Sequence, residues 1–181
     1  MQKKLHLVIV LLLCCSFMKQ TFAQPDGKMF YYDETDKYSF SYPQDWEILS
    51  TDTYVRLLPV QEDTAAIIEP LFQIATTAWS GDLKSFVKSN FNQELLAGRY
   101  RNFKLLDEKE EKINAMPAHK IEFSYELTGE AVQTICYMIE KNNRVYLLMG
   151  IGPQQNFETD FKKVYTDIAH SLRIVSFIMP E

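Results

Sequence analysis

Apolar and polar residues alternate along several short stretches of this chain, with the period of two that is typical of half-buried β-strands. The first stretch, YSFSY at residues 38–42, carries its aromatic side chains on one face. After a turn at residues 43–45 the alternation resumes at Trp46, which predicts a first hairpin whose aromatic residues face the core. The same criterion predicts strands over residues 54–58 and 71–77.

The apolar period changes to that of an α-helix in two places. Residues 82–97 carry an apolar stripe on one helical face, with Asp82 at the N-cap position and Gly98 just after the last turn. A longer stripe predicts a second helix over residues 154–172. The sequence therefore predicts two well-formed amphipathic helices.

The segment between these helices begins with strands that are expected to expose polar and charged side chains to solvent. Residues 107–112, DEKEEK, are all charged and indicate an exposed hairpin end or sheet edge. Residues 120–127 alternate strictly between polar and apolar. This pattern predicts that Lys120, Glu122 and Ser124 lie on a solvent-exposed face of their strand.

An antiparallel meander completes the pattern. Strands are predicted over residues 131–139 and 145–151, with turns at Thr128-Gly129 and at Asn142-Asn143, because glycine and asparagine tolerate the positive φ of a tight hairpin. The second of these strands is apolar on both faces, as expected of a central strand covered on both sides, and residues 173–178 can form an edge strand. Together the elements predict an α+β fold, an antiparallel β-sheet flanked by helices.

The N-terminus has the features of a secretory signal peptide. A basic region over residues 1–4 precedes an apolar run over residues 5–13, and Thr21-Phe22-Ala23 fits the small-residue pattern of a cleavage site. We therefore expect residues 1–23 to be a signal peptide that is cleaved near Ala23. The protein would then be exported, either to the periplasm or into the medium.

A competing prediction is a lipid anchor. The segment LLCCS at residues 12–16 is an imperfect lipobox, because a bulky residue precedes the cysteine where a small one is preferred. Acylation of Cys14 or Cys15 would tether the domain to a membrane, since each buried methylene adds about 0.8 kcal/mol. The sequence leaves free export and lipidation both open.

The mature chain is expected to consist of a linker, residues 24–29, and a single domain over residues 30–178. It has 158 residues, which is enough for one domain with its own core. Removal of residues 1–23 takes away three lysines and no acids, so the formal net charge changes from −5 to −8, which argues against nucleic acid as a partner. Cys136 is then the only cysteine, so no internal disulfide can form, and no later apolar run is long enough to span a membrane.

No motif in the chain predicts an enzyme. The patterns typical of metallohydrolases, serine hydrolases, dithiol oxidoreductases and P-loop proteins are absent. His119 and His170 lie far apart in sequence, and neither is paired with a nucleophile. Cys136 has no adjacent cation to lower its pKa. We therefore expect no catalytic residue.

An acidic loop is one candidate binding site. Asp33, Glu34 and Asp36 place three carboxylates within four residues, and hard cations such as calcium prefer oxygen ligands. The loop lacks the glycine and the distant glutamate of an EF-hand. The sequence therefore permits a divalent-cation site here, with a solvated acidic loop as the alternative and no other cofactor expected.

Three aromatic residues are a second candidate. Tyr31, Tyr32 and Trp79 lie outside the regular strand alternation, whereas the other N-terminal aromatic residues follow it. Aromatic side chains that no core pattern accounts for are typical of contact surfaces. We therefore expect these three to form an exposed patch that contacts a ligand or a protein partner.

Four segments together resemble the PsbP-like family: YSFSYPQDWEI, INAMPAHKIEFSYEL, RVYLLMGIGP and FETDFKKVYTDIAHSLRI. The likeness covers nearly the whole mature chain, and its motifs are structural. It implies an α/β/α sandwich around an antiparallel sheet, a fold shared with the Ran-binding Mog-type proteins, and it supplies no common catalytic residues. Plant members are extrinsic photosystem II subunits, so the resemblance implies a protein that assists a larger complex.

The expected function is that of an exported, non-enzymatic PsbP-like domain that binds or assists an envelope protein complex. The alternative is a periplasmic protein that binds a small ligand or a divalent metal ion, through the acidic loop or a cleft near Trp79. The sequence predicts no oligomeric state.

Overall fold

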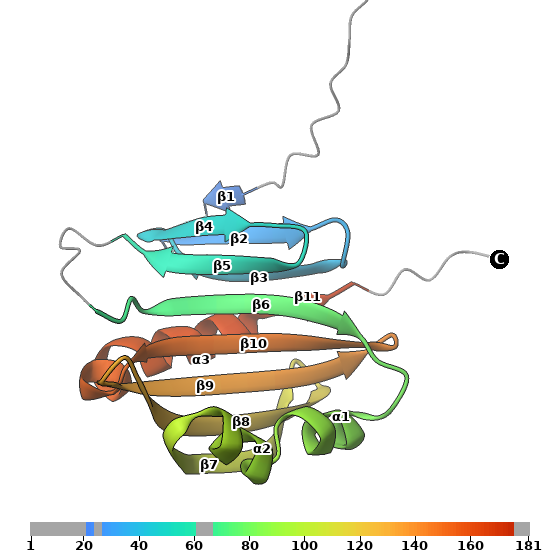
Figure 1. Ribbon diagram of the computed structural model, residues 1–181. Coiled ribbons are helices and arrows are strands. Elements are labelled where there is room, and N and C mark those ends of the chain that lie inside the picture. Colours follow the sequence, from blue (N-terminus) through green and yellow to red (C-terminus); the bar gives the residue numbers. More distant parts are fainter. Residues whose placement is uncertain (1–20, 24–26, 61–66, 176–181) are drawn as a thin grey trace, which may run out of the picture.

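A seven-stranded antiparallel sheet forms the centre of the structure, a computed structural model that describes residues 21–23, 27–60 and 67–175 (Figure 1). The strand order is β4-β5-β6-β10-β9-β8-β7, so β10 occupies the middle, as predicted for residues 145–151. The strands are β4 (Trp46–Ser50), β5 (Tyr54–Pro59), β6 (Leu71–Ala78), β7 (Arg101–Ile113), β8 (Met116–Leu127), β9 (Glu130–Lys141) and β10 (Arg144–Pro153).

A smaller four-stranded sheet packs on one face of the large one, in the order β1-β2-β3-β11. Its strands are β1 (Thr21–Ala23), β2 (Lys28–Asp33), β3 (Tyr38–Pro43) and β11 (Arg173–Ile174). Strand β2 begins two residues inside the predicted linker, because Lys28 and Met29 pair with β3. The final strand is shorter than predicted, and residues 176–178 of that prediction lie outside the described residues.

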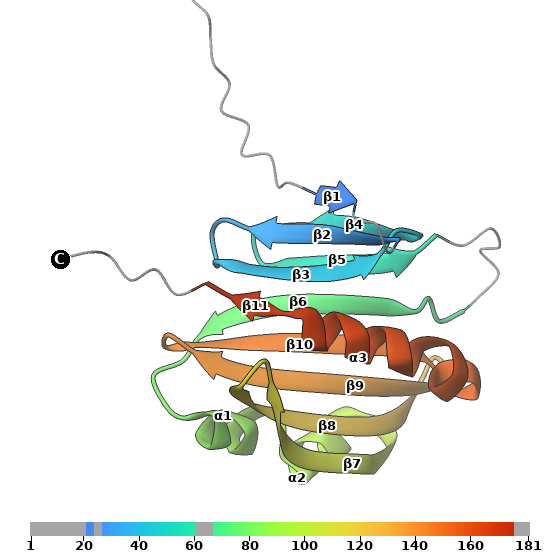
Figure 2. The same cartoon turned by 180° about the vertical axis from the view of Figure 1, so that it is seen from behind.

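Helices cover both faces of the large sheet, which confirms the predicted α+β class. Helices α1 (Leu83–Asn90) and α2 (Gln93–Arg99) lie on one face (Figure 1). On the other face a 3₁₀ turn, η1 (Gln154–Asn156), and a π turn, η2 (Phe157–Phe161), lead into α3 (Lys162–Ser171), which lies over β9 and β10 (Figure 2). No helix in the described part of the chain has the length and apolar character needed to cross a bilayer.

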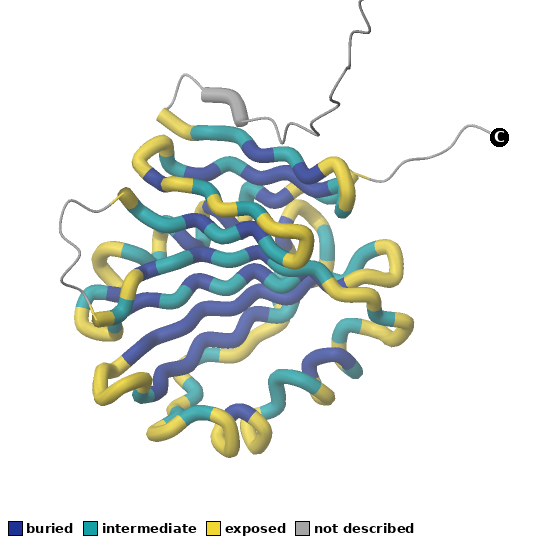
Figure 3. The backbone as a smooth tube through the Cα atoms, turned by 45° about the horizontal axis from the view of Figure 1, so that its top comes forward, coloured by how far each residue is buried: buried dark blue, intermediate teal, exposed yellow. Residues whose placement is uncertain are grey.

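The core consists of two apolar clusters separated by the large sheet. One joins the small sheet and α3 to the sheet, and the other joins α1 and α2 to its opposite face. The eight residues from Val132 to Ile139 of β9 are all buried, which makes β9 the most completely covered strand (Figure 3). The sheet therefore acts as a rigid wall between two separately packed layers.

The first predicted hairpin is wrong, although the predicted burial is right. Tyr38, Phe40, Tyr42 and Trp46 are all buried in one cluster. However, β3 pairs with β2 while β4 pairs with β5, so the turn at residues 44–45 carries the chain from one sheet to the other. Both sheets face the same core, so the alternation of side chains continues across the turn without any pairing.

The single helix predicted over residues 82–97 is two helices. Asp82 is the N-cap of α1, as predicted, and accepts a hydrogen bond from the backbone N–H of Ser85 at 2.7 Å. Asn92 then caps a new helix by accepting from the N–H of Leu95 at 2.9 Å, and Gly98 lies within this second helix instead of after it. An asparagine whose side chain accepts a hydrogen bond from the following turn can cap a new helix, and apolar periodicity alone does not reveal such a cap.

The predicted wet face of residues 120–127 is also wrong. Lys120, Glu122 and Ser124 are 7%, 2% and 3% exposed, because the C-terminal helical segment covers this face. Glu122 forms ion pairs with Lys120 at 3.1 Å and with Lys162 of α3 at 2.9 Å. The alternation correctly predicted which residues of this strand share a face. It did not predict that charged partners would cover the polar face.

Candidate functional site

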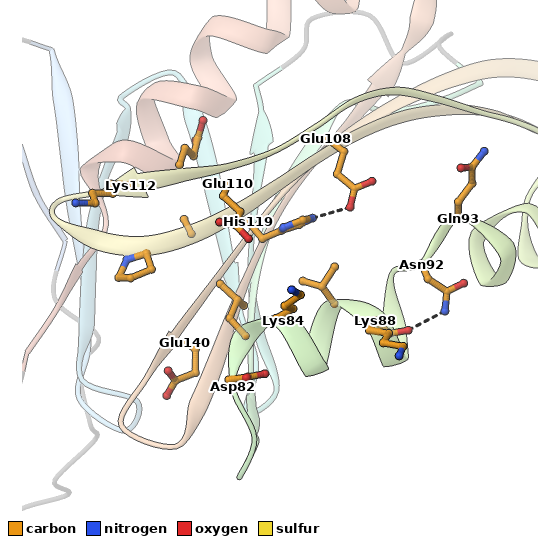
Figure 4. Close-up of a pocket in the computed structure, with 15 residues that line it drawn as sticks. Asp82, Lys84, Lys88, Asn92, Gln93, Glu108, Glu110, Lys112, His119 and Glu140 are labelled. Atoms are coloured by element: carbon orange, nitrogen blue, oxygen red, sulfur yellow. Dashed lines mark hydrogen bonds and ion pairs between the residues drawn. The ribbon is translucent and has the colours of Figure 1, made fainter.

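A cleft of about 900 Å³ lies between α1 and the hairpin formed by β7 and β8 (Figure 4). We call it the α1–hairpin cleft. Its lining residues are Asp82, Leu83, Lys84, Val87, Lys88, Asn92, Gln93, Glu108, Glu110, Glu111, Lys112, Pro117, Ala118, His119 and Glu140. Such a volume accommodates a small molecule or several residues of a protein partner.

The cleft exists because the hairpin extends beyond the helix that packs beside it. Helix α1 contacts β8 and β9 but ends before the hairpin tip at Asn114-Ala115. A β-bulge between Leu105 and Asp107 changes the register with β8, so Leu105 and Glu108 point to the same face. Beyond the bulge the apolar pattern ends, and charged side chains replace the residues that would otherwise be covered by a helix.

The hairpin wall of the cleft carries His119 and three charged residues of β7. Glu110 lies opposite His119 in the ladder, and Glu108 and Lys112 point to the same face. The Nε2 atom of His119 lies 3.0 Å from Oε1 of Glu108, and the histidine side chain is 15% exposed. His119 therefore lies at the rim of the core, against the charged side chains of β7.

The opposite wall is formed by α1. Lys84 and Lys88 are exposed, lie one helical turn apart and face the hairpin (Figure 4). Asp82 begins this wall, and its hydrogen bonds from Ser85 hold the pKa of its carboxyl below the usual range. Within the described ranges neither lysine forms an ion pair, so both remain able to bind an anionic group.

Trp79 lies beside this wall, next to the start of α1. Its indole Nε1 donates to the carbonyl oxygen of Asp82 at 3.1 Å, and its ring packs edge-on against Phe86 at 5.2 Å. The side chain is half-buried, so part of its surface reaches solvent. Trp79 therefore supports the start of α1 and can contribute to a contact surface next to the cleft.

Acidic groups balance the lysines of the cleft. Glu110 and Glu140 form no ion pair with any described residue, and neither does Lys112 at the hairpin tip. The lining contains no serine, threonine, cysteine or tyrosine. His119 therefore has no hydroxyl or thiol to activate in the cleft, and the charges present are suited to binding rather than to nucleophilic chemistry.

The prediction that Tyr31 is exposed is wrong. The side chain is 1% exposed and packs against Phe40 at a ring distance of 5.1 Å. Its hydroxyl donates to Asp33 at 3.2 Å, and burial raises the pKa of this phenol. Strand β2 turns Tyr31 toward the core and Tyr32 toward the outside, where Tyr32 is half-buried and distant from Trp79 in the chain and in the sheets.

The structure does not group Asp33, Glu34 and Asp36 as ligands of one cation. Asp33 is 6% exposed, and its Oδ1 accepts hydrogen bonds from the N–H groups of Thr35 and Asp36, both at 2.9 Å. Asp36 is paired with Arg144 and accepts from the hydroxyl of Thr76, while Glu34 is exposed. No three acidic, histidine or cysteine side chains among the described residues are grouped in a way that could hold a metal ion.

The remaining candidates are placed as follows. Cys136 is fully buried, and burial raises the pKa of its thiol, so the reactive thiolate is disfavoured. His170 is exposed and its Nε2 lies 3.5 Å from Glu111. The lipidation candidates Cys14 and Cys15 lie outside the described residues.

Sequence reasoning missed most of the cleft. Lys84, Lys88 and Glu140 resemble ordinary solvated residues, and only the DEKEEK run of β7 carried a signal, as an exposed edge. The cleft depends on the packing of α1 against strands that follow it by about 30 to 60 residues, which no local pattern encodes.

Comparison with known proteins identifies the family to which this fold belongs. The PsbP family model matches residues 27–174, which is most of the chain. No curated protein matches the sequence. The match begins one residue before β2 and ends with β11, so it covers α1, α2, α3 and every described strand except β1.

Three solved structures share this architecture at low sequence identity. Cyanobacterial PsbP (CyanoP) from Synechocystis sp. PCC 6803 has a TM-score of 0.63 at 12% identity, covering 82% of this chain and 93% of that one. LpqN of Mycobacterium tuberculosis, described as involved in cell envelope biogenesis, has a TM-score of 0.61 at 13% identity, with 87% and 90% covered. The Ran-binding protein Mog1p of Saccharomyces cerevisiae has a TM-score of 0.60 at 7% identity, with 82% and 96% covered.

Proposed function

This chain belongs to the PsbP family, and from that premise we propose that it is an exported, non-enzymatic domain that binds or assists a protein complex of the cell envelope. The α1–hairpin cleft is the proposed docking site. The observation that carries the proposal is a large cleft whose lining carries charges that form no ion pair with any described residue: Lys84 and Lys88 on α1, Glu110 and Lys112 on the hairpin, and Glu140 on β9.

The charge arrangement supports a protein partner. Charged groups at the rim of an interface give specificity and speed association more than they add affinity. The apolar residues Leu83, Val87 and Pro117 line the same cleft and can be covered by a partner. A surface with an apolar floor and a charged rim has the anatomy of a non-obligate protein interface.

The chemistry of the cleft supports a non-enzymatic role. Its histidine is held by Glu108 and faces no nucleophile, and the buried Cys136 lies on the covered strand β9. Elsewhere in the described chain, the strongest upward pKa shifts belong to buried phenols and this thiol, which burial keeps neutral. Such groups contribute to packing rather than to acid–base catalysis.

The envelope location is supported by the sequence and by the relatives. The N-terminal residues 1–23 have the pattern of an export signal. LpqN, which shares the fold, is described as involved in cell envelope biogenesis, and Mog1p is described as a Ran-binding protein, so this fold is used to bind proteins elsewhere. An exported domain that docks onto an envelope complex is consistent with both.

Affinity capture with matched variants tests the proposal. Residues 24–181 are immobilised and exposed to envelope extracts, and the retained proteins are identified by mass spectrometry. The native domain is expected to retain a reproducible partner that the Lys84→Glu/Lys88→Glu variant loses. The matched control is Lys163→Glu, a charge reversal on the exposed side of α3, which is expected to keep the partner. Equal retention by all three proteins, or by none, would contradict the proposal.

A further inference from the structure

Strand β7 is an unusually long free edge. It has 13 residues, ends the seven-stranded sheet, and pairs with β8 on one side only. Beyond the bulge, residues 107–113 pair regularly with β8, and no other described strand pairs with their opposite side. Free edges of this length are templates for another strand, unless their side chains oppose the pairing.

The side chains of this edge fall into two rows. Glu108, Glu110 and Lys112 point to the α1–hairpin cleft, whereas Lys109 and Glu111 point to the face that α3 covers. In an antiparallel pair, directly opposite residues project from the same face of the sheet. We call Glu108, Glu110 and Lys112 the cleft row. If β7 of a second copy paired with this edge, each residue of the cleft row could lie opposite only a residue of the partner's cleft row.

We propose that two copies of this chain pair edge to edge through β7, antiparallel and centred on Glu110, to form one continuous sheet. This register sets Glu108 opposite the partner's Lys112, and symmetry repeats the pair. On the other face it sets Lys109 opposite the partner's Glu111, again twice. Only the two Glu110 side chains, on the dyad, meet a like charge.

Neighbouring registers contain fewer attractive pairs than the four of the proposed register, so the sequence favours this one. A shift of two residues in one direction sets Glu108 opposite the partner's Glu110, Asp107 opposite the partner's Glu111, and the two Lys109 side chains opposite each other. All of these are like-charge pairs. A shift in the other direction keeps two attractive pairs, of Glu110 with the partner's Lys112, but sets Glu111 opposite itself and leaves Lys109 opposite Ile113. Opposite charges directly across a ladder stabilise the pairing, and like charges oppose it.

The proposed dimer brings the two clefts together. Because the dyad is perpendicular to the sheet, the cleft rows of both copies lie on the same side. The walls formed by α1, with Lys84 and Lys88, flank this shared surface from both ends. The dimer therefore offers a two-fold symmetric surface, and the pairing itself uses only residues of β7.

A charge-exchange experiment tests the pairing. Sedimentation velocity of residues 24–181 between about 5 and 500 µM, the range of weak protein pairs, is expected to show a monomer–dimer equilibrium. Glu108→Lys and Lys112→Glu are each expected to weaken self-association at least about tenfold, since each turns two attractive pairs into repulsive ones. An equimolar mixture of these two variants is expected to dimerise again, because every opposed pair in the mixed dimer is then attractive.

The mixture also separates misfolding from lost pairing. A variant that failed to fold would not regain association with its counterpart, and Glu108→Lys/Lys112→Glu in one chain is expected to dimerise as the native protein does. Glu110→Gln removes the like-charge contact on the dyad and is expected to tighten the dimer. A native protein that stays monomeric over the whole range, or single variants that associate as well as the native chain, would overturn the proposal.

Disulfide mapping tests the register directly. Glu110→Cys places two thiols on the dyad at a separation that a disulfide can bridge, so mild oxidation is expected to yield a covalent dimer. Lys109→Cys is the matched control, because the two introduced cysteines lie diagonally, too far apart to join. The native Cys136 is buried and does not interfere. Equal cross-linking of both variants would contradict this register.

Discussion

Asp33 shows at the scale of one residue why a carboxylate pattern does not specify a metal site. Its Oδ1 accepts two backbone N–H groups of its own turn, and its Oδ2 accepts the hydroxyl of Tyr31. The acidic loop is therefore a turn held by an internal acceptor, a common role of aspartate in loops. The sequence signal was the same for both roles, because each requires only a short polar side chain near the turn.

Replacement of Asp33 measures how much this turn contributes to the free energy of unfolding. Asp33→Ala is expected to lower the free energy of unfolding by about 1 to 3 kcal/mol, because two N–H groups and a buried hydroxyl lose their acceptor. Asp33→Asn keeps one acceptor oxygen and is expected to cost clearly less. Urea denaturation followed by fluorescence compares the two variants. An equal cost would mean that the negative charge, rather than the hydrogen bonds, stabilises the loop.

Calcium provides an independent check of the same residues. Because Asp33 and Asp36 are already engaged by protein donors, addition of calcium or manganese at about millimolar concentration, which fills weak extracellular sites, is expected to leave the melting temperature unchanged. Differential scanning fluorimetry measures the shift. A rise that Asp36→Asn abolishes would show that the loop binds the ion.

Gly150 is required by packing rather than by a ligand. A Cβ atom on this residue would meet the ring of Tyr165 at 2.3 Å, and Tyr165 is buried against Phe72 and Trp46. Gly150→Ala is therefore expected to destabilise the protein by about 1 to 3 kcal/mol through overpacking. Gly98→Ala is the control, because nothing lies within 4 Å of its Cβ position in α2, and it is expected to stabilise slightly. Thermal unfolding would contradict this explanation if both variants behaved alike.

At the scale of elements, periodicity predicted which segments form strands and which face the core. It did not predict pairing, because β3 and β4 face one core from two different sheets. It also did not predict what covers a polar face. Lys120 and Glu122 looked solvated, but Lys120 pairs with Asp107 and Glu122, and α3 supplies Lys162 to Glu122 from 40 residues away. Partners that are distant in sequence decide both points, and one chain does not reveal them.

The charged network between β8 and α3 makes stability depend on pH. A hydrogen bond from Lys120 lowers the pKa of Asp107. Burial alone would raise the pKa of Glu158, but hydrogen bonds from Lys162 and Gln133 outweigh the burial, so the pKa of Glu158 is lowered. Burial alone would lower the pKa values of Lys120 and Lys162. Their hydrogen bonds to carboxylates outweigh the burial, so both pKa values are raised.

The direction of each shift gives the expected profile. The acids contribute stability above their unfolded pKa of about 4 and lose it as the pH falls below that value. The lysines contribute below about pH 10.4 and lose their contribution as the pH rises further. Melting temperatures are therefore expected to form a plateau between these limits. Lys162→Met should flatten the acid limb, and Lys163→Met, which removes only an exposed pair, should not. Identical profiles for both variants would contradict the network.

At the scale of the whole molecule, the sequence predicted the family and the fold class more fully than the site. The structural motifs of the family are local, such as the aromatic residues of β3, so one chain displays them. The α1–hairpin cleft combines residues of α1, β7, β8 and β9, and its charges become a site only when these elements pack together. A local pattern could identify each wall as exposed, but not that the two walls face each other.

The central claim is that the α1–hairpin cleft docks an envelope protein, and cross-linking in living cells tests it most directly. A photoreactive benzoylphenylalanine is introduced at Lys88 in the cleft or at Lys163 on α3, both exposed positions. Illumination is expected to join the Lys88 variant to one reproducible envelope protein and the Lys163 variant to none. A partner captured equally well from Lys163, or captured only from there, would contradict the claim.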